Sequence, residues 1–252
     1  MTALPLLSIN INKYALLRNS RGRNAPDLLR SADLCIAAGA HGITVHPRLD
    51  QRHVRLGDVL PLTEHLRAAH PGIEFNIECD NRPELLDLVC SARPDQCTLV
   101  PVRPGEVTSD HGFAPEDVAA LRPSVERLVA AGVRVSAFVD CDLEHVRALA
   151  GSGVDRVELY TGPYAWAWGT EQAAGEQRRV ESTARAAAEL GLGLNAGHDL
   201  DRHNLSGLRG LAGLREVSIG HAQICRALEV GTHQAVRELL AALGHLNQES
   251  GR

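Results

Sequence analysis

The chain has 252 residues and a formal net charge of −5, with 44% hydrophobic and 23% charged residues. This length and balance are typical of one globular domain with a large buried core, and they exclude a mostly disordered chain. An acidic chain also lacks the broad basic field that binding to nucleic acid or an anionic membrane requires. Any anion that it binds must therefore be held by local groups.

The six cysteines include no C-x-x-C pair and lie in apolar segments, which indicates reduced, mostly buried thiols in a cytoplasmic protein. No positively charged segment precedes the short apolar run near Met1, and no apolar stretch approaches ~20 residues. We therefore expect neither a signal peptide nor a membrane span.

Short β-rich runs alternate with Ala-, Leu- and Arg-rich amphipathic stretches along the whole chain. The predicted strands cover residues 6–12, 42–47, 74–79, 96–101, 134–140, 156–162, 193–198 and 216–221. The predicted helices lie near residues 26–39, 57–70, 82–92, 115–131, 142–151, 171–190, 203–212 and 222–246.

This strict alternation indicates a parallel sheet, because parallel strands need crossover helices. Eight units favour closure into a single (β/α)8 TIM barrel that spans residues 1–252 as one catalytic domain. No G-x-G-x-x-G follows the first strand, which disfavours an open Rossmann sheet.

Polar and titratable residues stand at or just after nearly every predicted strand end, whereas we expect the strand interiors to be apolar. They are Asn10, Asn12, Lys13, His46, Arg48, Glu78, Thr108, Asp140, Thr161, Asn195, His198, Gly220 and His221. Barrels of this kind carry their active sites at the carboxyl ends of the strands, so the fold would bring these groups together.

The residue types suggest separate roles. Glu78 ends an apolar run, where burial favours a general base, and His46 and His198 titrate near neutrality and suit proton transfer. Cationic donors for a phosphate or carboxylate come from Arg21, Arg48 and His53, and Gly220-His221 offers free N–H groups at a helix start.

Each of these residues also has a purely structural interpretation, because a single His or Glu at a strand end is often only a hydrogen-bond partner. Three such residues on different strands favour catalysis. A metal site built from His46, Glu78, His198 and His221 has no ligand pair at diagnostic spacing, so we expect no metal there. Cys79 alternates to the opposite face from Glu78 and is expected to be buried packing.

Several segments resemble pyridoxine 5′-phosphate synthase, in the order and at the spacing of that family and over essentially the whole chain. They are Arg18-Asn19-Ser20-Arg21-Gly22, Gly42-Ile43-Thr44-Val45-His46-Pro47-Arg48, Arg52-His53, Asn76-Ile77-Glu78, Leu99-Val100-Pro101, Glu106-Val107-Thr108, Asn195-Ala196-Gly197-His198 and Ile219-Gly220-His221-Ala222. Each segment alone is a weak signal, and together they are highly specific.

The resemblance implies a cytoplasmic barrel enzyme of vitamin B6 biosynthesis, a homo-octamer assembled from dimers. It would condense 1-deoxy-D-xylulose 5-phosphate with 3-amino-2-oxopropyl phosphate and close a pyridine ring with loss of phosphate and water. No metal or organic cofactor is implied, and small phosphorylated molecules are the only implied ligands.

The resemblance also implies a role for each matched residue. His46 and Glu78 would accept protons and His198 would donate one. Asn10 and Gly220-His221 would hold the aminoketone phosphate. The deoxyxylulose phosphate would be held by Arg48, His53 and Thr108, with Arg21 supporting the site.

The sequence departs from the family pattern mainly at the site. Asn12-Lys13 replaces Asp-His, Asp199 and Cys225 each replace Gly, and Tyr160 replaces His. Lys13 is the single lysine among 26 basic residues, so either simple substrate binding or a Schiff base with a ketone is conceivable there. We therefore include Asn12, Lys13 and Asp199 among the candidate substrate-binding residues.

The departures leave two further functions open besides neutral drift in a synthase. One is a family member that condenses a different aminoketone or phosphosugar, and the other is a non-catalytic sugar-phosphate-binding paralogue. The aromatic group Tyr160, Tyr164, Trp166 and Trp168 would either line a substrate pocket or pack on helices or at a subunit interface.

Overall fold

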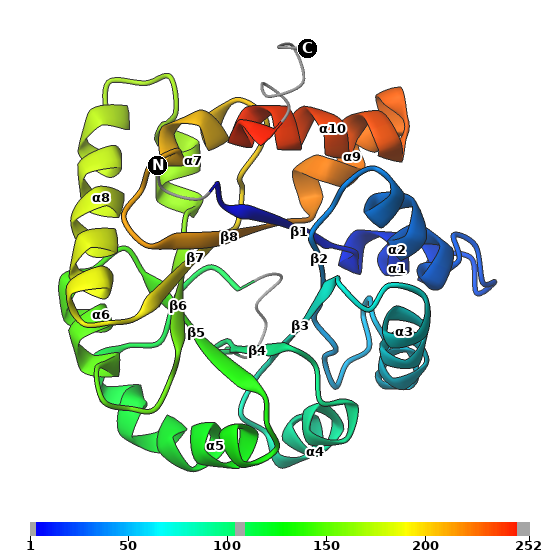
Figure 1. The fold of residues 1–252 in the computed structure, drawn as a ribbon, viewed down its shortest axis with the longest axis horizontal. Coiled ribbons are helices and arrows are strands. Elements are labelled where there is room, and N and C mark those ends of the chain that lie inside the picture. The colour runs from blue at the N-terminus through cyan, green and yellow to red at the C-terminus, as the bar shows by residue number, and fades with distance from the viewer. Residues whose placement is uncertain (1–3, 104–108, 246–252) are drawn as a thin grey trace.

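The computed structural model describes residues 4–103 and 109–245, and these form a closed barrel of eight parallel strands inside a ring of helices (Figure 1). The strands pair in chain order, and β8 pairs back with β1. The predicted (β/α)8 TIM barrel is therefore confirmed. The strands are β1 Leu6–Asn10, β2 Gly42–Val45, β3 Glu74–Cys79, β4 Gln96–Leu99, β5 Arg134–Asp140, β6 Arg156–Tyr160, β7 Gly193–Gly197 and β8 Leu214–Ile219.

The helices match the predicted ones in part. They are α1 Asn12–Asn19, α2 Leu28–Ala37, α3 Leu56–Ala69, α4 Pro83–Ala92, α5 Val118–Ala130, α6 Leu143–Leu149, α7 Gly162–Ala167, α8 Ala173–Glu189, α9 His221–Val230 and α10 Thr232–Leu243. Two short 3-10 turns, η1 Pro115–Asp117 and η2 Asn204–Leu208, complete the set.

The observed helices differ from the expected ones in four places. α1 and α7 each follow a strand directly, where polar strand-end residues and an aromatic run hid any helical period. The expected helix at 203–212 is only η2. The expected helix at 222–246 is divided into α9 and α10 at Gly231. This residue has a left-handed backbone with φ of 84°, a conformation that ends helices.

The strand residues that point outward form the main core against the helices. Leu7, Ile9, Ile43, Val45 and Ile77 are fully buried there. Cys79 belongs to the same core, and its Sγ lies 3.6 Å from Sγ of Cys97. This confirms the prediction that Cys79 is a buried core residue. The described cysteines are all free thiols.

The inward-facing strand positions correct the expectation of apolar strand interiors. Ser8 and Thr44 share a hydrogen bond of 2.7 Å between their hydroxyl oxygens, and the Thr98 hydroxyl donates to Oδ1 of Asn76 at 3.2 Å. The expectation was wrong because strands alternate: one face packs on helices and the other fills the barrel. The buried polar residues of the strand interiors are Ser8, Thr44, Asn76, Gln96, Thr98, Ser136, Glu158, Asn195, Glu216 and Ser218.

An ion network closes the amino-terminal end of the barrel. Arg134 Nη2 lies 2.5 Å and Arg156 Nη1 3.8 Å from Oε1 of Glu74. Burial and the neighbouring Glu74 carboxylate raise the pKa of Glu216 well above its usual range. These charges lie at the opposite end from the carboxyl ends of the strands, so they belong to the framework of the barrel.

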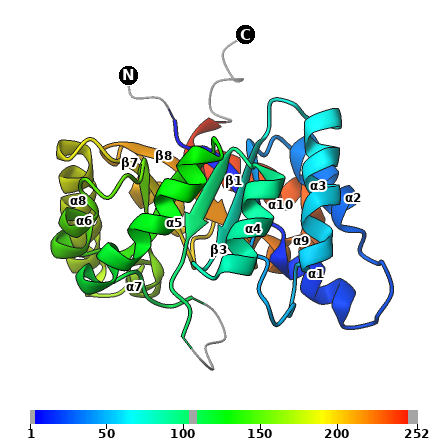
Figure 2. The same ribbon diagram turned by 90° about the horizontal axis from the view of Figure 1, so that it is seen from below.

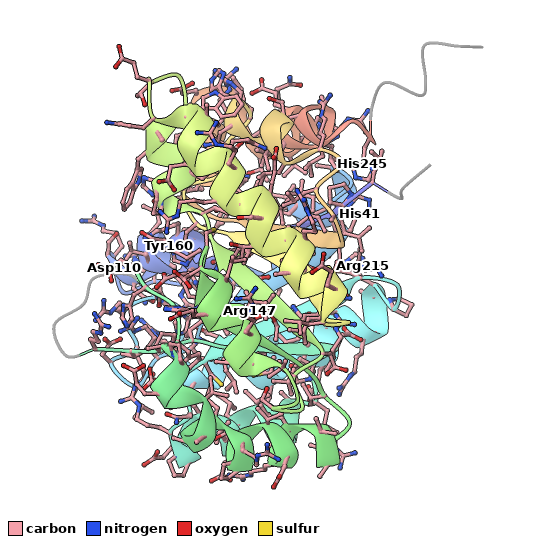
Figure 3. All side chains as sticks on the ribbon, turned by 90° about the vertical axis from the view of Figure 1, so that its left-hand side faces the viewer. His41, Asp110, Arg147, Tyr160, Arg215 and His245 are labelled. Atoms are coloured by element: carbon pink, nitrogen blue, oxygen red, sulfur yellow. The ribbon has the colours of Figure 1, made fainter. Side chains whose placement is uncertain are left out.

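The carboxyl ends of the strands, α1, α7 and the loop between β2 and α3 lie together at one end of the barrel (Figure 2). In the side view, Tyr160 and Asp110 mark this end, and His41 and His245 mark the other (Figure 3). No described helix is both long enough and apolar enough to cross a membrane.

Candidate active site

Glu78 is the point at which three strand ends meet. This residue is 7% exposed at the end of β3. Asn10 at the end of β1 donates from Nδ2 to Oε1 of Glu78 at 3.3 Å. On the other side, Nδ1 of His46, just after β2, lies 3.4 Å from Oε2 of Glu78. The closed barrel thus places side chains from three strands around one carboxylate.

His46 is held from two sides and keeps one nitrogen for another partner. Its backbone N–H donates to Oδ1 of Asn12 at 2.9 Å, and its Nδ1 faces Glu78. The Nε2 atom is buried and has no hydrogen-bond partner within residues 4–103 and 109–245. Buried polar atoms without partners are rare in proteins, so this nitrogen is a natural contact for a substrate.

His198 follows β7 and faces the same group of residues. Its ring packs against those of Phe138 and Tyr160, with centroid distances of 4.9 and 5.6 Å. Burial lowers the pKa of His198, whereas the negative charge of Glu78 opposes this shift. Glu78 and His46 both lie close enough to this ring to shift its pKa. The three candidate proton-transfer groups, His46, Glu78 and His198, therefore share one electrostatic environment.

The backbone at His198 and Asp199 is left-handed, with φ of 77° and 57°. Two side chains hold this turn: the Thr161 hydroxyl donates to the carbonyl of His198 at 2.7 Å, and Asn204 Nδ2 donates to that of Asp199 at 3.1 Å. Glycine is the usual residue in this conformation, and aspartate tolerates it better than most others. Asp199 is therefore compatible with the turn, and its side chain is exposed.

Asn12 connects the ends of β1 and β2. Its backbone N–H donates to Oδ1 of Asn10 at 3.0 Å, and its own Oδ1 accepts from His46. An asparagine oxygen serves as acceptor just as an aspartate oxygen would, so the side chain keeps this structural contact without the charge. Lys13 beside it is half-buried, and its charge lowers the pKa of both His53 and His198.

Arg48 and His53 line the loop between β2 and α3. Arg48 is 5% exposed, with Nε 3.9 Å from Oδ2 of Asp50. The ring centroid of His53 lies 6.0 Å from that of His46. Burial and then the charges of His46, Arg48 and Lys13 lower the pKa of His53 to about 3, so this imidazole is neutral at neutral pH.

Gly220 and His221 form the start of α9, opposite Asn10. A Cβ atom at position 220 would lie 3.0 Å from the carbonyl oxygen of Asn10, so glycine allows the end of β8 to approach β1. His221 is exposed, and its Nε2 lies 3.5 Å from Sγ of Cys225. The helix start directs backbone N–H groups toward the rim of the barrel.

Of the other predicted residues, the structure places one away from this group and does not describe the second. Arg21 lies in the exposed segment between α1 and α2, which extends away from the barrel (Figure 1). Thr108 lies outside the described residues.

Glu158 is a residue that the sequence analysis missed. It points into the barrel from β6, is 2% exposed, and its Oε2 lies 3.4 Å from the Thr98 hydroxyl oxygen. Its Oε1 occupies the space that a side chain at Gly197 would need. Burial and the nearby charge of Glu78 raise the pKa of Glu158 to about 8. The available signal was the alternation of Arg156, Glu158 and Tyr160 with apolar residues.

The aromatic group divides into two pairs. Tyr164 is buried, donates its hydroxyl to the carbonyl of Asn204 at 2.5 Å, and packs edge-on against Trp168. Tyr160 packs edge-on against Trp166, which is 64% exposed. Both line a cavity of about 480 Å³ beside the site, together with Asp140. Tyr164 also lines this cavity, so the first pair packs against the fold and borders the same open space as the second.

Comparison with known proteins finds relatives over nearly the whole chain. Residues 7–245 match the model of the family described as pyridoxal phosphate biosynthesis protein PdxJ. Among curated proteins, the chain is 48% identical over 244 residues to the pyridoxine 5′-phosphate synthase of Albidiferax ferrireducens, covering 94% of this chain and 96% of that one. The enzyme of the same name from Xanthomonas oryzae pv. oryzae is 49% identical over 240 residues, covering 92% and 93%.

Solved structures share the fold at low sequence identity. The tryptophan synthase A-subunit of Pyrococcus furiosus superposes with a TM-score of 0.64 at 14% identity, covering 94% of this chain and 98% of that one. The BexX/CysO complex of Amycolatopsis orientalis gives 0.64 at 18% identity, covering 98% and 92%. At these identities the likeness concerns the barrel alone.

Proposed function

The chain belongs to the family of pyridoxal phosphate biosynthesis protein PdxJ, and from this we propose that it condenses 1-deoxy-D-xylulose 5-phosphate with 3-amino-2-oxopropyl phosphate. The chain is thus an enzyme of vitamin B6 biosynthesis, and its product would be pyridoxine 5′-phosphate. Identities of 44–49% to curated synthases over nearly the whole chain favour this function over a synthase with altered substrates or a non-catalytic paralogue.

One observation carries the proposed chemistry: Glu78 is bonded to Asn10 and lies beside His46, whose Nε2 is buried and free to meet a substrate. Ring closure through imine and enamine steps needs several proton transfers, and groups that exchange protons must lie within hydrogen-bond reach. Glu78 and His46 would accept protons as the carbon–carbon and carbon–nitrogen bonds form. A proton could pass between them over the 3.4 Å that separates Nδ1 from Oε2.

His198 would return a proton to the leaving oxygen. Burial lowers the pKa of His198, so in the free enzyme the ring is mainly neutral at neutral pH. The negative charges of Glu78 and Asp199 favour its protonated form, and a bound phosphate would add to them. Substrate binding would thereby raise the pKa of His198 and favour the protonated form that acts as the acid.

Glu158 would limit the negative charge of the site by remaining protonated. With a pKa of about 8 it holds its proton at neutral pH, so it adds no second negative charge beside Glu78. Two carboxylates close together in a buried site cannot both ionise at low cost, which leaves the proton on the more buried one.

The two phosphates would bind at different parts of the rim. The start of α9 at Gly220-His221, with Asn10, would hold the aminoketone phosphate through backbone N–H groups. Arg48 would supply the positive charge for the deoxyxylulose phosphate, while neutral His53 would contribute a hydrogen bond. Thr108 would complete that side, and Asn12, Lys13 and Asp199 would contact the substrates between the two phosphates.

The wider setting follows from the same family membership. We propose that residues 1–252 form one catalytic domain, that eight copies assemble into a homo-octamer, and that the enzyme acts in the cytoplasm without a metal or organic cofactor. Light scattering of the purified protein tests the assembly: a mass near eight chains is expected, and a monomer would contradict it.

The experiment for the activity supplies both substrates to the purified enzyme and follows pyridoxine 5′-phosphate by chromatography and released phosphate by a colorimetric assay. Equal amounts of both products are expected. A folded protein that binds phosphate but releases no product would overturn the proposal. In that case other amino ketones would be screened in the same assay.

A further inference from the structure

A second group of potential ligands lies far from the active site, between two outer helices. Asp33 of α2 accepts from two imidazoles of the α3 region at a single oxygen: Oδ1 lies 2.7 Å from Nε2 of His65 and 2.8 Å from Nε2 of His70. All three residues are half-buried. They lie near the carboxyl end of α3, which is the end of the barrel opposite the active site, since α3 runs antiparallel to the strands.

The two histidines converge because α3 ends between them. Residues five apart on a regular helix lie about 140° apart around its axis and do not share a face. His70, however, has φ of −137° and ψ of 58°, outside the helical region, while its N–H still donates to the carbonyl of Leu66 at 2.8 Å. This turn swings its ring toward His65, with ring centroids 5.8 Å apart in an edge-on arrangement.

The charge of the group suits a cation. The Asp33 carboxylate accepts from both imidazoles and contributes the negative charge of the group. Arg67 of α3 does not compete for this carboxylate. Its Nη2 donates instead to the carbonyls of Ala92 and Arg93 at the end of α4, at 2.8 and 2.5 Å.

We propose that Asp33, His65 and His70 bind a late first-row divalent metal ion such as Zn²⁺. Two imidazole nitrogens and one carboxylate oxygen are ligands that Zn²⁺ prefers, and a fourth position remains for water. The three ligand atoms lie within 4.8 Å of one another, and within the described part of the chain they form the one such group of three.

Metal binding requires only a small local movement. Ligand atoms around a tetrahedral ion with bonds of about 2.1 Å are separated by about 3.4 Å, whereas Oδ1 now lies 2.7 and 2.8 Å from the two nitrogens. The Asp33 side chain is 41% exposed and is free to withdraw by the difference. Each neutral imidazole then carries its proton on Nδ1 and binds the ion through Nε2, and the ion joins α2 to α3.

The position of the site determines what the ion does. It lies at the end of the barrel opposite Glu78 and His46, so it does not contact the substrates. A ligand that binds the folded chain alone stabilises it in proportion to the logarithm of its concentration. Zn²⁺ at one hundred times its Kd is therefore expected to raise the Tm by about 5–10 °C and to leave the turnover rate unchanged.

The test compares the full-length protein with His65→Gln and His70→Gln, and with His233→Gln as a matched control at an exposed histidine of α10. Equilibrium dialysis against Zn²⁺ counts bound ions, and Co²⁺ in its place reports tetrahedral coordination by its visible absorption. We expect the unaltered chain and His233→Gln to bind one ion more per chain than either cluster variant. The Co²⁺ absorption and the rise in Tm should be lost in the same two variants.

Two results would overturn the proposal. One is equal binding of Zn²⁺ by all four proteins, which would place any bound ion elsewhere, for example on active-site histidines. The other is a lower Tm of both cluster variants without metal and no effect of Zn²⁺ on any protein, which would make the group a hydrogen-bonded clamp only. Circular dichroism confirms that each variant is folded, and Asp33→Asn provides a third variant if either histidine variant is not.

Discussion

The Nδ1 atom of His46 lies 3.4 Å from Oε2 of Glu78, and the opposite nitrogen of the same ring is buried without a partner in the described part of the chain. The pair joins the ends of β2 and β3, and Asn10 fixes the carboxylate from β1. This relationship is the basis of the proposed proton transfer, and it leads to the first prediction.

Glu78→Gln is expected to lower kcat by about 10²- to 10⁴-fold, because the amide keeps the shape of the side chain and cannot accept a proton. Steady-state kinetics with both substrates measure the loss. Glu84→Gln, the same change on the exposed first turn of α4, is the control and should keep full activity. A Glu78→Gln enzyme within tenfold of the unaltered rate would show that Glu78 is not the base.

Substitutions at Asn12 test whether its side-chain oxygen stabilises the fold as the acceptor for the His46 N–H. Asn12→Ala leaves the buried N–H of His46 without its acceptor, which costs about 1–3 kcal/mol of unfolding free energy. Asn12→Asp retains an acceptor oxygen and should cost clearly less. Urea unfolding of the two variants measures the difference. Equal losses would mean that the hydrogen bond to His46 contributes nothing.

Asp199→Gly is expected to shift the pH–rate profile of the enzyme and to change its unfolding free energy only slightly. Asp199 raises the pKa of His198, so removal of the carboxylate lowers that pKa further. The limb of the pH–rate profile that requires protonated His198 should then move to lower pH. The unfolding free energy should change by less than about 1 kcal/mol, because relief of the left-handed backbone offsets the added freedom of glycine in the unfolded chain.

The control for this variant is Arg93→Gly, which places glycine at another left-handed position, with φ of 48°, after α4. It should leave the pH–rate profile unchanged. A profile that moves equally in both variants would assign the effect to the backbone and not to the charge of Asp199.

Glu158→Gln is expected to make the protein more stable at pH 8 and no more stable near pH 4. The folded pKa of Glu158 is about 8 and its usual value is 4.5, so the folded state binds the proton more tightly. Its stabilising contribution is complete below the unfolded pKa and is lost as the pH rises through the folded one. Urea unfolding at both pH values, for the variant and the unaltered chain, measures this. A difference that does not depend on pH would contradict the raised pKa.

Much of the fold and part of the site could be read from local sequence. Glu74–Cys79 and Arg134–Asp140 were predicted with their observed bounds, because alternation of side chains across a strand is a property of neighbouring residues. The order of strands and helices likewise predicted the parallel barrel. Since the carboxyl ends of parallel strands meet at one end of a barrel, Asn10, His46 and Glu78 were expected to converge, and they do.

What only the tertiary structure decided is which face of each strand points inward and which distant side chains meet. Glu158 became a buried acid because barrel closure turned it toward Glu78, and Asp33 met two histidines because α2 packs beside the end of α3. Local sequence determines periodicity, which is set by backbone geometry over a few residues. Burial, pKa and ligand geometry depend on groups that are far apart in the chain, and only the closed barrel brings them within reach of one another.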